Sequence, residues 1–501
     1  MPDFLGNQVD MTTSGIMVQS DAEKAFYALV EKLLPVSPAD LLFMGEFPGV
    51  WINALEAQGH KVTGLDWRDQ TAYAQPPAGT RHALLQVDLA LPETHDRLFD
   101  VALIADFTPD VHPLALFDQL DSLLNKDATV LLVGPETTMD SPRLVHWLDY
   151  VMAIGKRCGF DVLESSPEGP VNDAPFFVRA LRRGTTPRWR ISHVLPKDFP
   201  EIAQLFEEVF GHSLSRDLWN WKYGAGHGNA VMVRRGDGML VAHYGGMYRN
   251  IQLFGKPDWA FQICDVMVHA KERGVLTRQG PFVLAAASCA EIYGPLGYGF
   301  PNRRAMLVAE KMGLYAEAGQ MAEVRWGPSA SGFRLRTRVR HIDFHDAVNE
   351  RESVNQLWTQ MANDLQDGVV GERNWDYLEQ RYFHHPHHQY EVLLVSARFT
   401  GRPLGIAVLR RLEAACELLD VIAPLCNLGL VIDQARRITG RWGLPFLYCW
   451  ITKNHLPLFL ACEGKEEELD ISIPTSCWTA DPRSEQMKGK WWLMSGDTDF
   501  R

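Results

Sequence analysis

Residues 261–315 decide the fold of this chain, and they read FQICDVMVHAKERGVLTRQGPFVLAAASCAEIYGPLGYGFPNRRAMLVAEKMGLY. The pattern predicts an apolar strand over Phe261–Val268, a turn over Lys271–Gly280 and a helix of small residues over Phe282–Ile292. A short strand and a second helix, led by Asn302, complete the stretch. A basic turn that contains glycine and precedes a helix is an anion site, because free N–H groups and the positive end of the helix dipole face the ligand.

Two motifs in this stretch resemble the signatures of the GNAT (Gcn5-related N-acetyltransferase) superfamily. The run VHAKERG at residues 268–274 is similar to the family's V-x-P-x-x-R-G, with alanine in place of the usual proline. The NRRA run that starts at Asn302 and the KMGL run at 311–314 are similar to its second signature. The resemblance implies transfer of an acetyl or other short acyl group to a primary amine of a small molecule, sugar or peptide. The other reading of the same residues is an ordinary strand–helix–strand unit with a solvated basic turn.

The resemblance also implies a co-substrate, acetyl-CoA or another acyl-CoA, with its pyrophosphate on the basic turn. The residues expected to contact it are Val266, Val268, Arg273, Gly274, Val275, Leu276, Thr277, Arg278, Gly280 and Asn302. The family's tyrosine that protonates the departing CoA thiolate is replaced by Ala309.

Three residues are candidates for the chemistry. Asp265 lies in the central strand and is a candidate general base, acting directly or through water. Tyr298 is a candidate acid in place of Ala309, and Tyr244, on the preceding strand, is a candidate cleft residue. The alternatives are a buried aspartate that ties the strand to a neighbour and, for Tyr298, a packing aromatic with a wet hydroxyl.

Residues 20–184 alternate strands and helices and end on an antiparallel hairpin, which resembles the class I S-adenosylmethionine methyltransferase fold, a Rossmann-like doubly wound sheet. The positions match for a cofactor loop at Gly45–Gly49, a ribose-binding acid at Asp66 and an adenine-side acid at Asp88. Asp66 is equally well explained as a strand-end acid that caps a turn. Because Pro48 removes an N–H donor and crowds the loop, we expect a retained fold without methyl transfer or S-adenosylmethionine binding.

The plan of residues 188–328 recurs over residues 333–501. A helix-ending tyrosine precedes a strand aspartate by 42 residues in the first copy, Tyr223 to Asp265, and by 38 in the second, Tyr382 to Asp420. The second copy lacks an Arg-Gly turn, so we expect it to bind no CoA. Tandem halves with one working site resemble the Eis-like aminoglycoside acetyltransferases in architecture. The predicted fold class is therefore α/β and α+β, a Rossmann-like domain followed by two GNAT-like domains.

Composition limits the partners of the chain. The net charge of −13 argues against nucleic acid as the main partner, because phosphate binding needs a basic face. The eight cysteines are scattered without a C-x-x-C pair, and no apolar run is long enough to span a membrane, which predicts a reduced, cytoplasmic protein. The histidine run at 384–388 has no cysteine or carboxylate partner in sequence, so we predict a solvated turn and no metal.

Two other functions fit the same residues. Both cofactor loops depart from their family patterns, which is also typical of a non-catalytic scaffold or sensor. Alternatively, the chain both methylates and acylates. The sequence does not choose the amine acceptor, and it indicates no oligomeric state.

Overall fold

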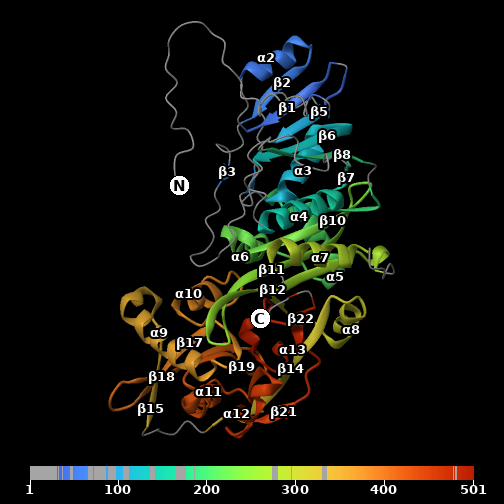
Figure 1. Ribbon diagram of the computed structural model, residues 1–501. Coiled ribbons are helices and arrows are strands. Elements are labelled where there is room, and N and C mark those ends of the chain that lie inside the picture. The colour runs from blue at the N-terminus through green and yellow to red at the C-terminus, as the bar shows by residue number, and fades with distance from the viewer. Residues whose placement is uncertain are drawn as a thin grey trace, which may run out of the picture. The chain divides into compact units, whose positions relative to one another are not determined.

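A computed structural model of the chain is shown in Figure 1. It describes residues 31, 33–36, 38–45, 49–65, 71–72, 86–87, 98–104, 112–135, 142–163, 176–184, 187–273, 280–294, 296–329, 336–477, 479 and 482–500. The predicted Asp66, Asp88 and Pro48 lie outside these residues, as does the turn at 274–279. The described residues fall into two compact units, one before residue 186 and one after it. No helix in this part of the chain is both long and apolar enough to cross a membrane.

The first unit contains a six-stranded sheet of order β2-β1-β5-β6-β8-β7. Its strands are β1 (Asp40–Met44), β2 (Lys61–Leu65), β5 (Phe99–Ile104), β6 (Leu124–Pro135), β7 (Phe160–Val162) and β8 (Phe176–Arg183). The helices are α2 (Gly49–Ala57), α3 (Pro113–Leu123) and α4 (Pro142–Cys158), and β3 (Thr71–Ala72) pairs with β4 (Gln86–Val87). The strands from β2 to β6 run parallel, whereas β8 and β7 are antiparallel. Parallel strands are covered on both faces, which explains why the apolar run of β1 is buried throughout.

The first half of the second unit begins with a sheet of order β13-β12-β11-β10-β9. The strands are β9 (Trp189–His193), β10 (Gly228–Arg235), β11 (Leu240–Leu253), β12 (Lys256–Val268) and β13 (Gly297–Tyr298). The helices are α5 (Phe199–Phe210), α6 (Arg216–Tyr223), α7 (Pro281–Tyr293) and α8 (Arg303–Lys311). The helix α6 begins because the Ser215 hydroxyl accepts a hydrogen bond from the N–H of Leu218, a standard N-cap.

The second half repeats this order of elements. Its strands are β15 (Thr337–His341), β17 (Glu391–Ala397), β18 (Pro403–Arg411), β19 (Cys416–Ile422) and β20 (Leu447–Thr452). Its helices are α9 (Ala347–Asp364), α10 (Trp375–Leu378) with a π-helical turn at Glu379–Phe383, α11 (Leu428–Arg441), α12 (Leu456–Leu460) and α13 (Ser484–Met487). In both halves a strand and two helices precede three antiparallel strands, and a helix then leads to a strand parallel to the third.

The two halves exchange strands. The strand that follows α8, β14 (Tyr315–Trp326), pairs with β20, β21 (Lys465–Glu467) and β22 (Ser472–Ser476) in the second sheet. In return, β16 (Val369–Gly371) from the second half pairs with β11, and it also pairs with β23 (Trp491–Trp492). The halves share an apolar core around Tyr298, Met321, Trp450 and Trp491. They therefore lie together in one compact unit.

Candidate active site

The edge of β12 opens where its pairing with β13 stops. The only pairs between these strands are Phe261 with Gly297 and Gln262 with Tyr298, so residues 263–268 have no β13 partner among the described residues. On its other edge β12 stays paired with β11 as far as its last residue, Val268. The strand thus has an edge that β13 leaves unpaired over these residues, and backbone N–H groups on such an edge are suited to bind a ligand.

A β-bulge interrupts the open part of β12. The register with β11 shifts between the pairs His243–Met267 and Gly245–Cys264, so Asp265 and Val266 together lie opposite Tyr244. Asp265 has a φ of 49°, in the left-handed region that non-glycine residues rarely adopt. Such a conformation costs about 1–3 kcal/mol and persists only where neighbours impose it.

The neighbours of Asp265 impose this conformation. The Nζ of Lys222 lies 2.8 Å from Oδ1, and the Tyr223 hydroxyl donates to Oδ2 over 2.7 Å. The backbone carbonyl of Asp265 lies 2.8 Å from Nδ1 of the buried His243. The side chain and the main chain of Asp265 are therefore both held by hydrogen bonds.

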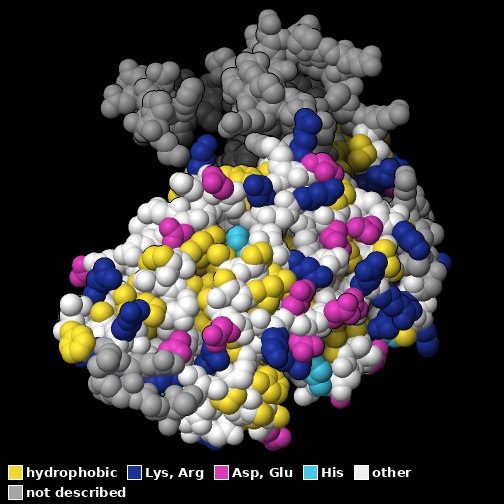
Figure 2. Space-filling view, turned by 90° about the horizontal axis from the view of Figure 1, so that it is seen from below, with side chains coloured by type: hydrophobic (Ala, Val, Ile, Leu, Met, Phe, Trp, Pro, Cys, Tyr) yellow, Lys and Arg dark blue, Asp and Glu magenta, His cyan; other side chains and the backbone are white. Residues whose placement is uncertain are grey.

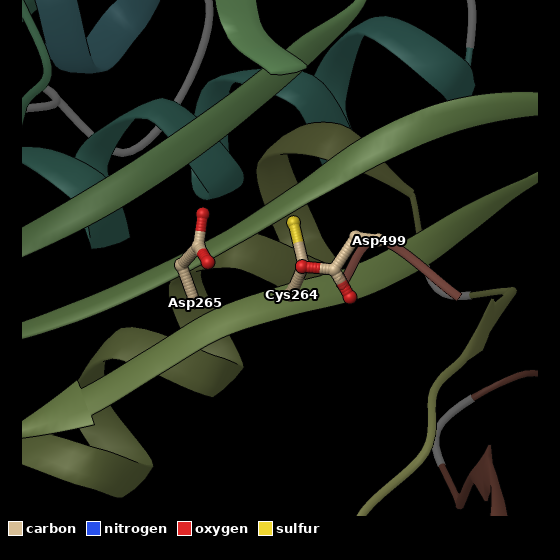
Figure 3. A group of neighbouring side chains, drawn as sticks. All are labelled: Cys264, Asp265 and Asp499. Carbon is tan, nitrogen blue, oxygen red and sulfur yellow. The ribbon is translucent and has the colours of Figure 1, made fainter. Parts of the chain in front are cut away.

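Asp499, far along the chain, completes the cluster. Its Oδ2 lies 2.7 Å from Nζ of Lys222, so one ammonium, only 3% exposed, bridges two carboxylates. Figure 3 shows Asp499 beside Cys264 and Asp265 of β12, and one potential metal-ligating atom from each lies within 4.8 Å of the others. Because Lys222 already supplies the positive charge between the carboxylates, we assign no metal to this group.

The electrostatics of the cluster keep Lys222 and Asp265 charged. Burial acts to lower the pKa of Lys222, but Asp265 and Asp499 outweigh it and the pKa ends above its usual value. Burial acts to raise the pKa of Asp265, but Lys222 outweighs it and the pKa ends below its usual range. Burial and Asp265 raise the pKa of Tyr223, which stays a neutral donor. A carboxylate held in this way is a weak base, so the geometry favours the tying role for Asp265.

The two candidate tyrosines are buried. Tyr244 lies in β11 opposite the bulge. The Tyr298 ring packs 4.8 Å from the ring of Trp491, and its hydroxyl lies 3.5 Å from Oε1 of Gln262. Burial raises the pKa of Tyr298. Both contacts fit the packing alternative, and the catalytic roles of the tyrosines stay predictions.

The described part of the predicted CoA turn is anchored to the sheet. Val266 and Val268 are half-buried on the open edge of β12, and Nε of Arg273 donates to the carbonyl of Val268 over 2.8 Å. Gly280 is the N-cap of α7, and Asn302 caps α8 by accepting from the N–H of Ala305 over 2.9 Å. The other predicted contacts lie outside the described residues: Gly274, Val275, Leu276, Thr277 and Arg278.

A buried acid beneath this turn was missed from the sequence. Glu272 is 4% exposed and receives Nη2 of Arg188 at 3.4 Å and Nε1 of Trp189 at 3.3 Å, while Nη1 of Arg235 lies at 3.7 Å. These partners come from β9, its flank and β10. Glu272, which precedes Arg273, therefore ties the start of the predicted CoA turn to β9 and β10.

The second half has the same opening, but the chain itself fills it. β19 pairs with β20 only at Cys416 and Glu417, and its register with β18 shifts at Leu419. Beyond that point Met494 bridges Ile451, and the N–H of Thr452 donates to the carbonyl of Leu493. Residues 491–500, which we name the C-terminal strap, therefore occupy this opening.

A second cation–aspartate cluster stands at the corresponding bulge. Nε of Arg373 donates to Oδ1 of Asp420 over 2.8 Å, and Nη2 donates to Oδ2 of Asp497 over 2.6 Å. The hydroxyls of Tyr377 and Tyr382 donate to Oδ2 of Asp420 over 3.0 and 3.1 Å. In each half a buried cation thus joins a strand aspartate to an aspartate of the strap. The sequence repeat matched Tyr382 with Tyr223 and Asp420 with Asp265, but nothing local marked Lys222, Arg373 or the strap.

Comparison with known proteins identifies part of the second unit. Residues 190–280 match the family model described as "Acetyltransferase (GNAT) domain", which supports a GNAT acetyltransferase domain in this part of the chain. No curated protein matches the chain. On the face shown in Figure 2, basic and acidic side chains are interspersed and form no continuous surface of one sign among the described residues.

Several solved structures are similar to the chain. A probable N-acyltransferase from Enterococcus faecalis V583 is 12% identical, with a TM-score of 0.45 over 57% of this chain and 71% of that one. A GCN5-related N-acetyltransferase from Anabaena variabilis is 12% identical, with a TM-score of 0.44 over 57% and 72%. Saccharomyces cerevisiae N-myristoyltransferase with bound myristoyl-CoA is 10% identical, with a TM-score of 0.39 over 59% and 84%.

Proposed function

We propose that this protein is a CoA-dependent N-acyltransferase that moves an acetyl or other short acyl group from acyl-CoA to a primary amine. The observation that carries the proposal is the open, bulged edge of β12 over residues 263–268, within the stretch that matches the GNAT family. The acceptor is an amine of a small molecule, a sugar or a peptide.

The chemistry requires positioning more than covalent help from the protein. The amine nitrogen attacks the thioester carbon, the C–N bond forms, the C–S bond breaks, the amine loses a proton and the thiolate gains one. Backbone N–H groups on the open edge of β12 are suited to hold the thioester oxygen where negative charge develops. The basic turn and the N-terminus of α7, capped by Gly280, are suited to the pyrophosphate.

We propose that Asp265 acts on the geometry of the bulge instead of removing the amine proton. Its two carboxylate oxygens are engaged by Lys222 and Tyr223 at 2.8 and 2.7 Å. A base in that position would have to break a buried ion pair before accepting a proton, which is costly. We also propose that Tyr244 lies in the acceptor cleft and that Tyr298 acts as the acid in place of Ala309.

The other parts of the chain are proposed to be degenerate relatives of two folds. Residues 333–501 form a second GNAT-like domain that binds no CoA, because the strap occupies its opening and the segment after β19 lacks arginine. Residues 188–328 form the acyl-CoA-binding domain. Residues 20–184 form a methyltransferase-like domain in which Pro48 disfavours S-adenosylmethionine.

The second candidate function is a scaffold or sensor that binds CoA without turnover. Ala309, buried in α8, favours it because no acid stands where the family's tyrosine acts. An assay of acyl transfer from acetyl-CoA to a panel of amines, with release of free thiol as the readout, separates the two functions. A scaffold releases no thiol above the background rate.

The binding site is tested with the variant that carries both Arg273→Ala and Arg278→Ala. Charge-assisted bonds contribute roughly 1.5–3 kcal/mol each if they reach the phosphates, so we expect CoA binding measured by calorimetry to weaken more than tenfold. The melting temperature of the apo protein should stay nearly constant. A matched control removes two exposed arginines of the second half, Arg351→Ala with Arg402→Ala, and should bind as the parent does. A double variant that binds CoA like the parent, or a parent that binds no CoA, contradicts the proposal.

A further inference from the structure

The C-terminal strap contacts both halves of the second unit. Its first part lies against β20 through Leu493 and Met494. Arg381, after α10, then holds its backbone, because Nε donates to the carbonyl of Gly496 over 2.8 Å and Nη2 to that of Thr498 over 2.9 Å. Arg381 is buried, so these bonds are shielded from water.

Beyond Thr498 the strap reaches the bulge of the first half. Asp497 binds the Arg373 cluster at 2.6 Å, and Asp499, two residues later, binds Lys222 at 2.7 Å. Figure 1 accordingly shows the end of the chain beside β12. The second half therefore contributes a charged side chain to the open site of the first, and without it the cluster around Asp265 lacks one of its two carboxylates.

Asp499 restricts the position of the Lys222 ammonium. Lysine is a flexible chain with a point charge, and with one carboxylate partner it can swing about that partner. Two partners at 2.8 and 2.7 Å leave it one position. That position also fixes Oδ1 of Asp265, whose backbone has the strained φ of 49°. The chain of contacts runs from the strap through Lys222 to the main chain of β12.

We propose that Asp499 is a positioning residue for the first half's site: through Lys222 and Asp265 it fixes the bulge, and so aims the backbone N–H groups on the open edge of β12. The inference rests on the proposed acyl transfer for its kinetic part only. The active site is then composite, built on the first half and completed by the strap that the second half holds.

The test is Asp499→Asn, which keeps the shape of the side chain and removes its charge. Loss of a well-placed oxyanion donor costs about 10²–10³ in kcat, and a misaimed donor costs less, so we expect kcat to fall about 10- to 100-fold. The KM for acetyl-CoA should change less than twofold, because the pyrophosphate turn is untouched. Hydrogen exchange of the backbone amides at 263–268 should become faster, which requires no turnover.

The matched control is Glu417→Gln. Glu417 is fully buried on β19 and its Oε2 lies 2.6 Å from Nη2 of Arg410, so this variant also weakens a buried ion pair, away from the open site. We expect a comparable loss of melting temperature, with kcat within twofold of the parent and unchanged exchange at 263–268.

Each result decides the inference. Unchanged kcat and exchange in Asp499→Asn overturn it, and so does an equal loss of kcat in Glu417→Gln. A fall in kcat with unchanged exchange also overturns it and indicates direct proton transfer by Asp499 instead. If the parent protein transfers no acyl group, the proposed function fails, and faster exchange at 263–268 in Asp499→Asn alone still supports the positioning role.

Discussion

Lys222 and Asp499 are 277 positions apart in the chain, and their Nζ and Oδ2 atoms lie 2.7 Å apart. The contact joins α6, near the start of the second unit, to the strap near its end. It forms only when both sheets and the strap are in place. The stability of the second unit should therefore depend strongly on this one ammonium.

Replacing Lys222 with methionine should lower the free energy of unfolding by about 3–5 kcal/mol, because the buried Asp265 and the partly buried Asp499 lose their cation. Urea unfolding followed by tryptophan fluorescence measures the change. Lys222→Arg keeps the charge and should lose less. Lys256→Met, at an exposed position of β12, is the control and should unfold like the parent. A methionine variant as stable as the parent contradicts the prediction.

Replacing Gly496 with alanine should loosen the strap. A Cβ at this position would lie 2.2 Å from the Tyr382 hydroxyl and 2.9 Å from the carbonyl of Leu419, so the strap or β19 must shift. Such overpacking costs typically about 1–3 kcal/mol. Gly319→Ala is the control, because an added Cβ there has no atom within 4 Å. The melting temperatures of the two variants are compared. Equal values would show that the opening accommodates an added methyl group and would contradict the prediction.

Acidification should destabilise the second unit between about pH 6.5 and pH 4. Burial lowers the pKa of His193 to about 4, and burial together with Arg381 lowers the pKa of His385 to about 3. The unfolded chain binds protons at these histidines near their ordinary pKa of about 6.5 and the folded chain does not, so stability rises with pH in this window. Thermal unfolding from pH 7 to pH 4.5 measures the slope, and His193→Gln should make it shallower. A melting temperature that rises on acidification would disprove this account.

S-adenosylmethionine should bind the chain more weakly than micromolar, because Pro48 removes a backbone donor from the predicted cofactor loop. Calorimetry with the full chain measures this. Micromolar binding would overturn the expectation and favour the bifunctional alternative. Pro48→Gly is the informative partner variant: a gain of binding in it would identify proline as the obstacle.

The sequence predicted elements whose signals are local. The predicted strand at 261–268 lies within β12, and the predicted small-residue helix lies within α7. The predicted Asn302-led helix is α8, with Asn302 as its N-cap. For Asp265 the sequence left two roles open, and the choice depends on Lys222 and Asp499, which no local pattern connects to it. The turn predicted for the histidine run was wrong for one residue, since His385 is buried against Trp221.

The exchange of β14 and β16 was also beyond sequence reasoning. β16 is a three-residue strand that is buried throughout, and an apolar pattern shows only that a segment is buried, not which sheet receives it. The strap was missed for a similar reason. A short segment with two tryptophans does not show from its sequence which opening in the fold it occupies.

The exchanged strand β14 makes the covalent order of the halves differ from their spatial order. A fragment that stops at Trp326 would carry β14 without β20, its principal hydrogen-bonding partner. A fragment that starts at Thr337 would leave β20 and β22 with an unpaired edge of the kind that drives aggregation. Neither half keeps all of its sheet pairing when it is cut out alone, so we expect a fragment of either half to aggregate instead of folding.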